Sequence, residues 1–322
     1  MEEEKEMFAV LAVDDDPHAL EILTAFLESQ GHVVFTAENA SQALEELVKQ
    51  VFDVVISDVM MPGMDGFELC RHIKEHNSLL PVVLVTALGE KEDRLKGIEA
   101  GCDDFFTKPF DRLELQARVS SLGRLKRSHE DLEHAEEVLN TLAYGVETRD
   151  DTTGEHCRRL SEMGTSFARF LQLNRSDTEA LEKAGILHDI GKIAVPDSIL
   201  LKPGPLDEQE WEIMKTHPVK GEELLKPLRT VQNVLPIVRH HHERWDGKGY
   251  PDGLKGSEIP FLARVFQLID ITDALVYSRP YKESMPIDKA LEILHNESME
   301  GKRDSELTKQ FIHFFSTKVH YF

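Results

Sequence analysis

Cysteine is scarce in this sequence, which has only Cys70, Cys102 and Cys157 among its 322 residues. Because the three are scattered and form no CxxC pair, they argue against a disulfide framework and against a zinc site built from thiolates. The sequence also lacks any run approaching the roughly 18 apolar residues that span a bilayer. Its N-terminus is acidic and has neither the basic nor the apolar region of a signal peptide. These absences predict a cytoplasmic protein without a membrane partner.

Basic residues are outnumbered, because 37 Lys and Arg stand against 59 Asp and Glu and leave a formal net charge of -22. A chain this acidic repels a polyanion, so we expect no DNA partner. A small phosphate compound would bind only where metal ions reverse the local field. The length exceeds that of one ordinary core and predicts two domains.

Strand and helix patterns alternate through the first third of the chain, which predicts an α/β domain with a doubly wound, parallel sheet of five strands. The expected strands are residues 8–13, 33–36, 54–57, 82–86 and 104–107. The expected helices are residues 17–30, 41–50, 67–76 and 91–100, followed by one that begins at Asp111. Ligands of such sheets bind at the carboxyl ends of the strands.

Polar residues stand where the expected strands end, and a parallel sheet would bring them to one edge. They are Asp14 and Asp15 after the first strand, Asp58 after the third, Thr86 at the end of the fourth and Lys108 after the fifth. Three carboxylates at one edge repel one another unless they hold a hard cation, and Mg²⁺ prefers oxygen ligands. We expect Asp58, on the central strand, to be the phospho-acceptor, with Mg²⁺ and Lys108 neutralising the developing charge. The backbone carbonyl of Met60 would complete the Mg²⁺ shell.

With this arrangement, residues 7–122 resemble a response-regulator receiver domain. The resemblance implies that Asp14 and Asp15 are its acidic pair and Asp58 its phosphorylation site. It also implies that Thr86, Phe105 and Lys108 are switch residues, and that a sensor histidine kinase is a partner. The alternative is that these are ordinary polar residues at strand ends, which five such positions in register make improbable.

A highly charged helical pattern follows from about residue 113 to residue 148. Leu125, Leu132 and Leu139 recur every seven residues, with a second stripe of Ser128, Ala135 and Leu142. This pattern indicates either a connector helix packed on a domain or a short coiled coil that forms a homodimer, and we slightly favour the homodimer. Beyond it helical periodicity dominates, so the second domain is expected to be all-α. We expect the domains to be residues 1–122 and 149–322, joined by a connector at 123–148.

The second domain has a set of residues with metal-binding chemistry. His188 and Asp189 end an apolar helix pattern, where a buried imidazole and carboxylate are costly unless they bind a metal or each other. Further candidates are His156, His217, His241, His242 and Asp270. A single buried histidine is usually a core residue, and the run from His240 to His242 could be a solvated helix end. Together, however, imidazoles and a bridging carboxylate suit a pair of Mn, Fe or Zn ions, which can catalyse phosphoester hydrolysis.

The order of these residues, with the loop at 246–251 (DGKGYP), resembles the HD-GYP family of phosphodiesterases over roughly residues 140–315. The resemblance implies seven metal ligands, with Asp189 as the bridge: His156, His188, Asp189, His217, His241, His242 and Asp270. It implies catalytic roles for His188, Asp189 and Lys192. It also implies substrate contacts from Lys192, Tyr250, Arg279 and Lys282.

The whole arrangement implies a receiver-controlled hydrolase that converts cyclic di-GMP to pGpG, with a further step to GMP left open. Some members of the family use a Glu four residues before the first histidine to hold a third ion, and here that position is Thr152. We therefore expect two ions, with Fe or Mn favoured. Two alternatives stay open: a phosphodiesterase for another cyclic dinucleotide, and a non-catalytic sensor that binds such a nucleotide and acts through protein partners.

Overall fold

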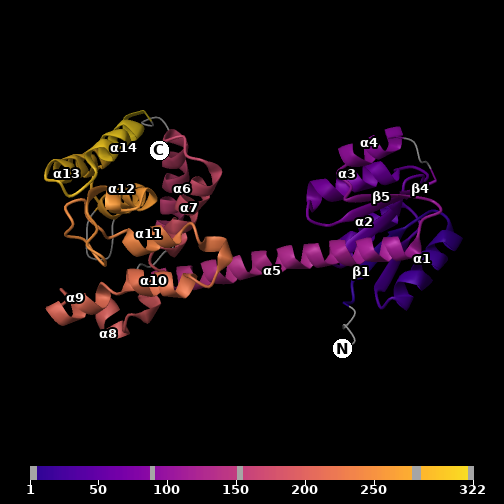
Figure 1. The fold of residues 1–322 in the computed structure, drawn as a ribbon, viewed down its shortest axis with the longest axis horizontal. Coiled ribbons are helices and arrows are strands. Elements are labelled where there is room, and N and C mark those ends of the chain that lie inside the picture. Colours follow the sequence, from indigo (N-terminus) through magenta and orange to yellow (C-terminus); the bar gives the residue numbers. More distant parts are fainter. Residues whose placement is uncertain (1–5, 88–90, 151–154, 278–283, 318–322) are drawn as a thin grey trace. The chain divides into compact units, whose positions relative to one another are not determined.

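The computed structural model describes residues 6–87, 91–150, 155–277 and 284–317. Its first part is a five-stranded sheet in the order β2-β1-β3-β4-β5, and every strand pair is parallel (Figure 1). The strands are β1 (Ala9–Val13), β2 (Val33–Ala37), β3 (Val54–Asp58), β4 (Val82–Thr86) and β5 (Asp104–Thr107). The helices between them are α1 (Pro17–Ser29), α2 (Ala40–Lys49), α3 (Gly66–His76) and α4 (Lys91–Glu99). The predicted doubly wound sheet is confirmed.

Helices cover both faces of this sheet. Leu27 of α1 and Leu115 of α5 (Arg112–Asp150) pack in one apolar cluster with Val54 of β3. Leu69 of α3 packs in the other cluster, with Val55 on the opposite face of the same strand. Both β3 and β4 are buried along their whole length, and each begins with a continuous apolar run, VVI in β3 and VVLV in β4, rather than an alternating pattern.

Helix α5 (Arg112–Asp150) is one unbroken helix of 39 residues. By compactness the chain divides within it, into Met1–Ala135 and Glu136–Phe322. Leu139 packs against the core of the second unit. The side chains of Leu125 and Leu132 are 58% and 50% exposed. The three leucines of the predicted heptad therefore have different surroundings within a single chain.

The second unit is built from helices. They are α6 (Glu155–Phe170), α7 (Arg175–Leu187), α8 (Asp197–Leu200), α9 (Glu208–Met214), α10 (His217–Leu225), α11 (Leu235–His240), α12 (Phe261–Val276), α13 (Ile287–Met299) and α14 (Ser305–Thr317), with short 3₁₀ turns at Ile190–Ala194, Arg229–Val231 and Gly256–Glu258. No strand occurs among the described residues of this unit, and its one isolated β-bridge joins Asp246 and Lys255. The predicted all-α class of the second domain is confirmed.

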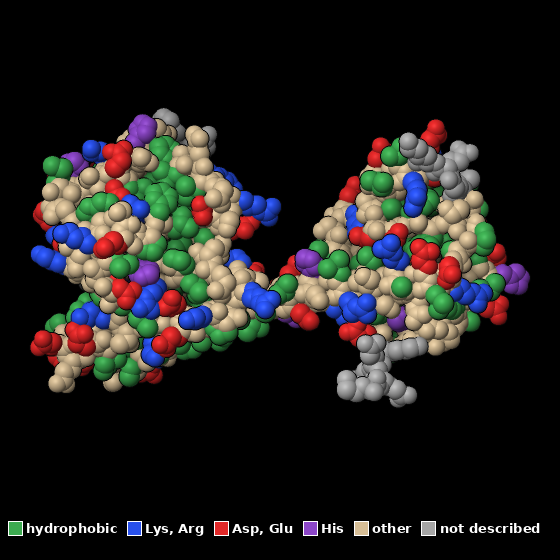
Figure 2. Space-filling model, viewed as in Figure 1, with side chains coloured by type: hydrophobic (Ala, Val, Ile, Leu, Met, Phe, Trp, Pro, Cys, Tyr) green, Lys and Arg blue, Asp and Glu red, His purple; other side chains and the backbone are tan. Residues whose placement is uncertain are grey.

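The sequence also predicts that the chain has neither a DNA partner nor a membrane partner, and the surface and the helices are relevant to these two expectations. Lys and Arg side chains are interspersed with Asp and Glu on the face shown in Figure 2. In the part of the chain that the structure describes, no helix is both long and apolar enough to cross a membrane.

Candidate metal centre

The first group of ligand atoms comes from three helices of the second unit. His156 lies on α6, His188 caps the end of α7, and Asp270 lies on α12. Each offers one ligand atom within 4.8 Å of the other two, and the Nε2 atom of His156 lies 3.8 Å from Oδ1 of Asp270. Both imidazoles are buried. The helical packing thus brings together three residues that are separated by long stretches of sequence.

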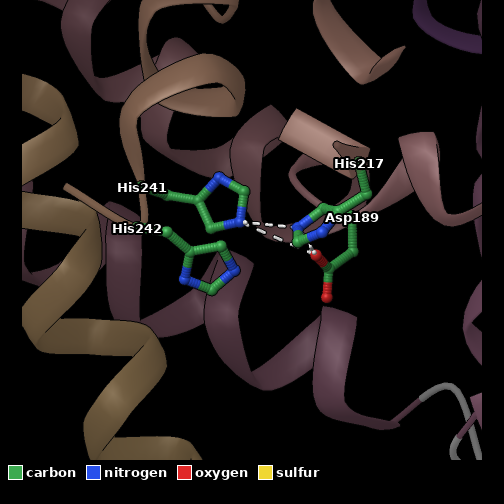
Figure 3. Close-up of side chains that lie close together, drawn as sticks. All are labelled: Asp189, His217, His241 and His242. Atoms are coloured by element: carbon green, nitrogen blue, oxygen red, sulfur yellow. Dashed lines mark hydrogen bonds and ion pairs between the residues drawn. The ribbon is translucent and has the colours of Figure 1, made fainter. Parts of the chain in front are cut away.

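The second group contains Asp189, His217, His241 and His242, whose ligand atoms also lie within 4.8 Å of one another (Figure 3). His217 begins α10, while the adjacent His241 and His242 follow the end of α11. The Nε2 atoms of His217 and His241 lie 3.4 Å apart, and they lie 3.1 Å and 3.6 Å from Oδ1 of Asp189. Three imidazoles and a carboxylate oxygen therefore converge on one point.

Asp189 stands between the two groups. Its Oδ1 atom faces His217 and His241, and its Oδ2 atom lies 3.3 Å from Nε2 of His188 in the first group. Oδ1 is buried and accepts no hydrogen bond within the described structure, and such a buried orphan oxygen is costly. A pair of cations would satisfy both oxygens, so the residues present fit a two-ion centre.

Backbone contacts orient the imidazoles. The Nδ1 atom of His188 lies 3.1 Å from the carbonyl of Ala184, and Nδ1 of His241 lies 2.8 Å from the carbonyl of Val238. His217 makes the equivalent contact, at 2.8 Å, with the carbonyl of Met214. An Nδ1–H that donates to a carbonyl leaves the Nε2 lone pair for a metal, which is the usual arrangement around metal-binding histidines.

The electrostatics of the centre favour a cation. Burial opposes charge on both His188 and Asp189, but the Asp189 carboxylate raises the pKa of His188 to about 9. Lys192 and His188 in turn hold the pKa of Asp189 well below its usual range. Burial lowers the pKa of His241, and burial together with the charge of His241 lowers that of His242. The neutral imidazoles of His241 and His242 beside the ionised Asp189 are in the protonation states that a metal requires, whereas His188 would give up its proton on binding one.

The predicted substrate residues lie at different distances from this centre. The Lys192 ammonium lies 2.9 Å from Oδ2 of Asp189. The Tyr250 ring lies 4.8 Å from the ring of His242, and burial raises the pKa of Tyr250 above its usual range, so the phenol keeps its proton. Arg279 and Lys282 lie outside the described residues, as does Thr152.

Three buried acidic residues near the centre were not predicted from the sequence. Asp273 lies 2.5 Å from Nδ1 of His156. Glu243 is fully buried and accepts backbone N–H bonds of 2.7–3.1 Å from residues 252, 253 and 254, which directly follow the loop at 246–251. Glu147, on α5, has Oε1 3.9 Å from Nε2 of His156. Asp273 has a sequence signal, because it follows Asp270 by three residues and so shares its helix face. The spacing of the sequence gives no comparable signal for Glu243 or Glu147.

The receiver sheet also brings its predicted residues to one edge. The Lys108 ammonium lies 2.8 Å from Asp14 and 2.6 Å from Asp58. The other oxygen of Asp58 accepts a hydrogen bond of 2.6 Å from the backbone N–H of Met60. Thr86 is fully buried at the end of β4, while Asp15 is exposed. Phe105 packs against the apolar cluster under α3. Burial raises the pKa of Asp58, although Lys108 opposes this effect.

Comparison with known proteins follows the same division of the chain. Residues 10–120 match the response regulator receiver domain, and residues 133–307 match an HD domain. The chain is 40% identical over 266 residues to the cyclic di-GMP phosphodiesterase response regulator RpfG of Xanthomonas campestris, covering 76% of this chain and 70% of that protein. It is 36% identical to a cyclic di-GMP phosphodiesterase of Thermotoga maritima, covering 94% and 89%. A Vibrio cholerae 3′3′-cGAMP-specific phosphodiesterase 2 is 42% identical over 153 residues, 47% of this chain and 29% of that protein.

The fold, the clustered ligands and these matches define a response regulator whose output domain is a metal-dependent phosphodiesterase. The chain belongs to the family in which a receiver domain is joined to an HD-GYP domain of the cyclic di-GMP phosphodiesterase kind.

Proposed function

We propose that this chain hydrolyses cyclic di-GMP to linear pGpG under the control of its receiver domain. The observation that carries the proposal is the position of Asp189, whose two oxygens face two separate groups of ligand atoms. A carboxylate in that position is suited to bridge a pair of ions. Relatives that align over most of their length with this chain are named cyclic di-GMP phosphodiesterases, which supports the choice of nucleotide.

In this proposal each group holds one ion. His156, His188 and Asp270 would hold the first ion, His217, His241 and His242 would hold the second, and Asp189 would contribute to both. When bound, an ion pair supplies Lewis acidity that activates a water and neutralises charge on the phosphodiester. Fe and Mn are the two metals that the ligand set favours, and both bind imidazole together with carboxylate ligands.

The protein's own side chains would hold the nucleotide. Lys192, which contacts Asp189, would face one phosphate, and the protonated phenol of Tyr250 can donate a hydrogen bond. Arg279 and Lys282 are proposed to bind the second phosphate. Such local cations are needed because a chain of net charge -22 otherwise repels a dianionic substrate.

The receiver is proposed to control this activity through phosphorylation of Asp58 by a sensor histidine kinase. Mg²⁺ would be held by the carboxylates of Asp14, Asp15 and Asp58 and by the carbonyl of Met60. Lys108 already contacts both Asp14 and Asp58, so it is placed to stabilise a phosphoryl group on Asp58. Thr86 and Phe105 would carry the resulting change. We further propose a division into a receiver at residues 1–122, a connector at 123–148 and a phosphodiesterase domain at 149–322.

The test is to incubate the full chain anaerobically with Mn²⁺ or Fe²⁺ and either cyclic di-GMP or 3′3′-cGAMP, and to separate the products by chromatography. We expect pGpG from cyclic di-GMP, faster than any linear product from cGAMP. An Asp189→Asn variant should lose this activity, whereas Asp288→Asn, at an exposed position on α13, should keep it.

Each alternative has its own result in this assay. Binding of cyclic di-GMP by metal-loaded protein without turnover would support a non-catalytic sensor instead. Faster cleavage of cGAMP would make the hybrid nucleotide the substrate, a possibility that the Vibrio cholerae relative raises. Accumulation of GMP would show that the second phosphodiester is cleaved as well.

A further inference from the structure

Glu147 is a buried carboxylate that the proposed mechanism has not used. Within α5, Leu139 and Ala143 belong to the apolar core of the second unit, and Val146 is buried as well. Glu147 continues this inward face of the helix but is only 4% exposed. An ionised carboxylate in such surroundings is costly unless a cation or hydrogen-bond donors compensate it.

The described structure supplies little compensation from the protein itself. The Glu147 carboxylate accepts no hydrogen bond from a described residue, and the basic group beside it is the imidazole of His156. Oε1 of Glu147 lies 3.9 Å from Nε2 of His156, which is too long for a hydrogen bond. The charge of Glu147 is also felt by the buried thiol of Cys157, whose pKa burial raises to about 12.

The same nitrogen of His156 faces a second carboxylate. Oδ1 of Asp270, on α12, lies 3.8 Å from Nε2 of His156. The opposite ring nitrogen, Nδ1, is held 2.5 Å from Asp273. The lone pair at Nε2 is therefore directed towards two carboxylates from different helices. These carboxylates would repel each other in the absence of a cation between them.

The spacing suits a shared metal ion. A ligand nitrogen or carboxylate oxygen lies about 2.0–2.2 Å from a bound transition metal, so two ligands on opposite sides of one ion can be up to about 4.2 Å apart. Both separations from His156 lie inside that limit, at 3.8 Å and 3.9 Å. Groups at these distances make no direct hydrogen bond. Glu147 lies outside the group of His156, His188 and Asp270 whose ligand atoms are all within 4.8 Å of one another, so its side chain would have to turn towards the other two residues to join the shell.

We propose that Glu147 is a ligand of the ion held by His156 and Asp270. This inference rests on the proposed metal-dependent function, and it places the end of α5 in direct contact with the metal centre. The expectation of two ions is unchanged, because Glu147 adds a carboxylate to the first ion rather than a site for another. The ion on this side would then have oxygen ligands from two helices besides the bridging Asp189.

The test is metal binding by the full-length protein without nucleotide. Equilibrium dialysis against Mn²⁺, with elemental analysis of the bound metal, is compared for wild type, Glu147→Gln and Glu133→Gln. Glu133 is an exposed glutamate on the same helix, so its variant has the same loss of charge. We expect one of two Mn²⁺ ions to bind at least about tenfold more weakly in Glu147→Gln, since even indirect supports of a metal site are worth 10–100-fold. The Glu133→Gln variant should bind as wild type does.

Two Mn²⁺ ions bound with wild-type affinity by Glu147→Gln would overturn the assignment. If that variant fails to fold, wild-type crystals soaked in Mn²⁺ decide instead. An anomalous peak within about 2.3 Å of a Glu147 oxygen supports the proposal, and peaks elsewhere in the centre but not there refute it.

Nucleotide turnover is measured separately, so the two proposals fail in different ways. A wild-type protein that loads two ions but leaves cyclic di-GMP intact, together with weakened metal loading in Glu147→Gln, contradicts the proposed function and supports Glu147 as a ligand. A wild-type protein that hydrolyses cyclic di-GMP, with unaltered metal loading in Glu147→Gln, supports the proposed function and contradicts the assignment of Glu147 as a ligand.

Discussion

The Nδ1 atom of His156 lies 2.5 Å from a carboxylate oxygen of Asp273, and both side chains are buried. Arg159 donates to the same carboxylate with bonds of 2.6 Å and 3.0 Å, and its guanidinium stacks 3.9 Å from the ring of Tyr277. Burial opposes the charge of Asp273, but the bond from Arg159 holds its pKa below the usual range. The carboxylate is therefore fixed and ionised, and it fixes the direction in which His156 presents Nε2.

The first prediction concerns this support. Asp273→Asn should weaken Mn²⁺ binding by about 10–100-fold, because removal of a hydrogen-bond partner of a ligating imidazole usually has that effect. The ion on the side of His156 should be lost first. Titration of metal-free protein with Mn²⁺ measures the change, and Asp288→Asn, on an exposed helix start, is the matched control. If Asp273→Asn binds each of the two ions with the same affinity as wild type, Asp273 serves only the packing of α12 against α6.

The second prediction concerns the receiver. Treatment with acetyl phosphate and Mg²⁺ should phosphorylate the wild-type chain but not Asp58→Asn. Asp58 combines a position at the end of the central strand β3 with a contact of 2.6 Å to Lys108. Intact-mass measurement gives the extent of phosphorylation, and Asp288→Asn should be modified as wild type is. Incorporation of equal phosphate into Asp58→Asn would assign the phospho-acceptor elsewhere.

The edge of the receiver sheet could be predicted because strand ends in a parallel sheet meet at a fixed place. Asp14, Asp58 and Lys108 are far apart in sequence, yet each follows or ends a strand. In the structure, the Lys108 ammonium donates hydrogen bonds to both carboxylates. Periodicity, turn residues and strand order are local signals that determine such an edge.

The supports of the metal centre could not be predicted in that way. Asp273 and His156 are 117 residues apart, and their contact depends on how α12 packs against α6. Glu147 lies in a helix whose charged sequence is typical of a solvated connector, and only the packing shows that this residue is buried. The sequence of the leucine heptad likewise does not indicate whether these side chains pack against a second copy of the protein or against the core of their own chain. In the structure, Leu139 packs against the core of its own chain.

The third prediction concerns the loop at 246–251 and residues 252–254, which directly follow it. Glu243→Gln should destabilise the protein by about 1–3 kcal/mol, because the two carboxylate oxygens together accept three backbone N–H bonds, whereas an amide keeps one acceptor oxygen and its NH₂ group cannot accept the remaining bonds. Denaturant unfolding of metal-free protein measures the loss. Glu258→Gln, which affects a single backbone N–H bond at Lys255 on the surface, is the control and should cost much less. A stability equal to wild type would show that the loop does not depend on Glu243.

The fourth prediction concerns the exposed apolar stripe of α5. Leu125 and Leu132 are half exposed in the single chain and lie one heptad apart, so they fall on one face of the helix. Burial of such leucines against a second copy is worth about 1.5–3 kcal/mol each, which would favour a homodimer. Light scattering should therefore give the mass of a dimer for wild type and of a monomer for the double variant Leu125→Glu, Leu132→Glu.

Val138→Glu is the matched control for this stripe, because Val138 is also exposed on α5 but lies off the heptad positions of the two leucines. It should remain dimeric, since a negative charge is introduced on the same helix but off the proposed contact. The measurement is made before and after treatment with acetyl phosphate, because a dimer that forms only on phosphorylation would link Asp58 to the contact. A wild-type chain that stays monomeric at high concentration in both states would contradict the prediction. In that case α5 would serve only the chain that contains it, since Leu139 already packs within that chain.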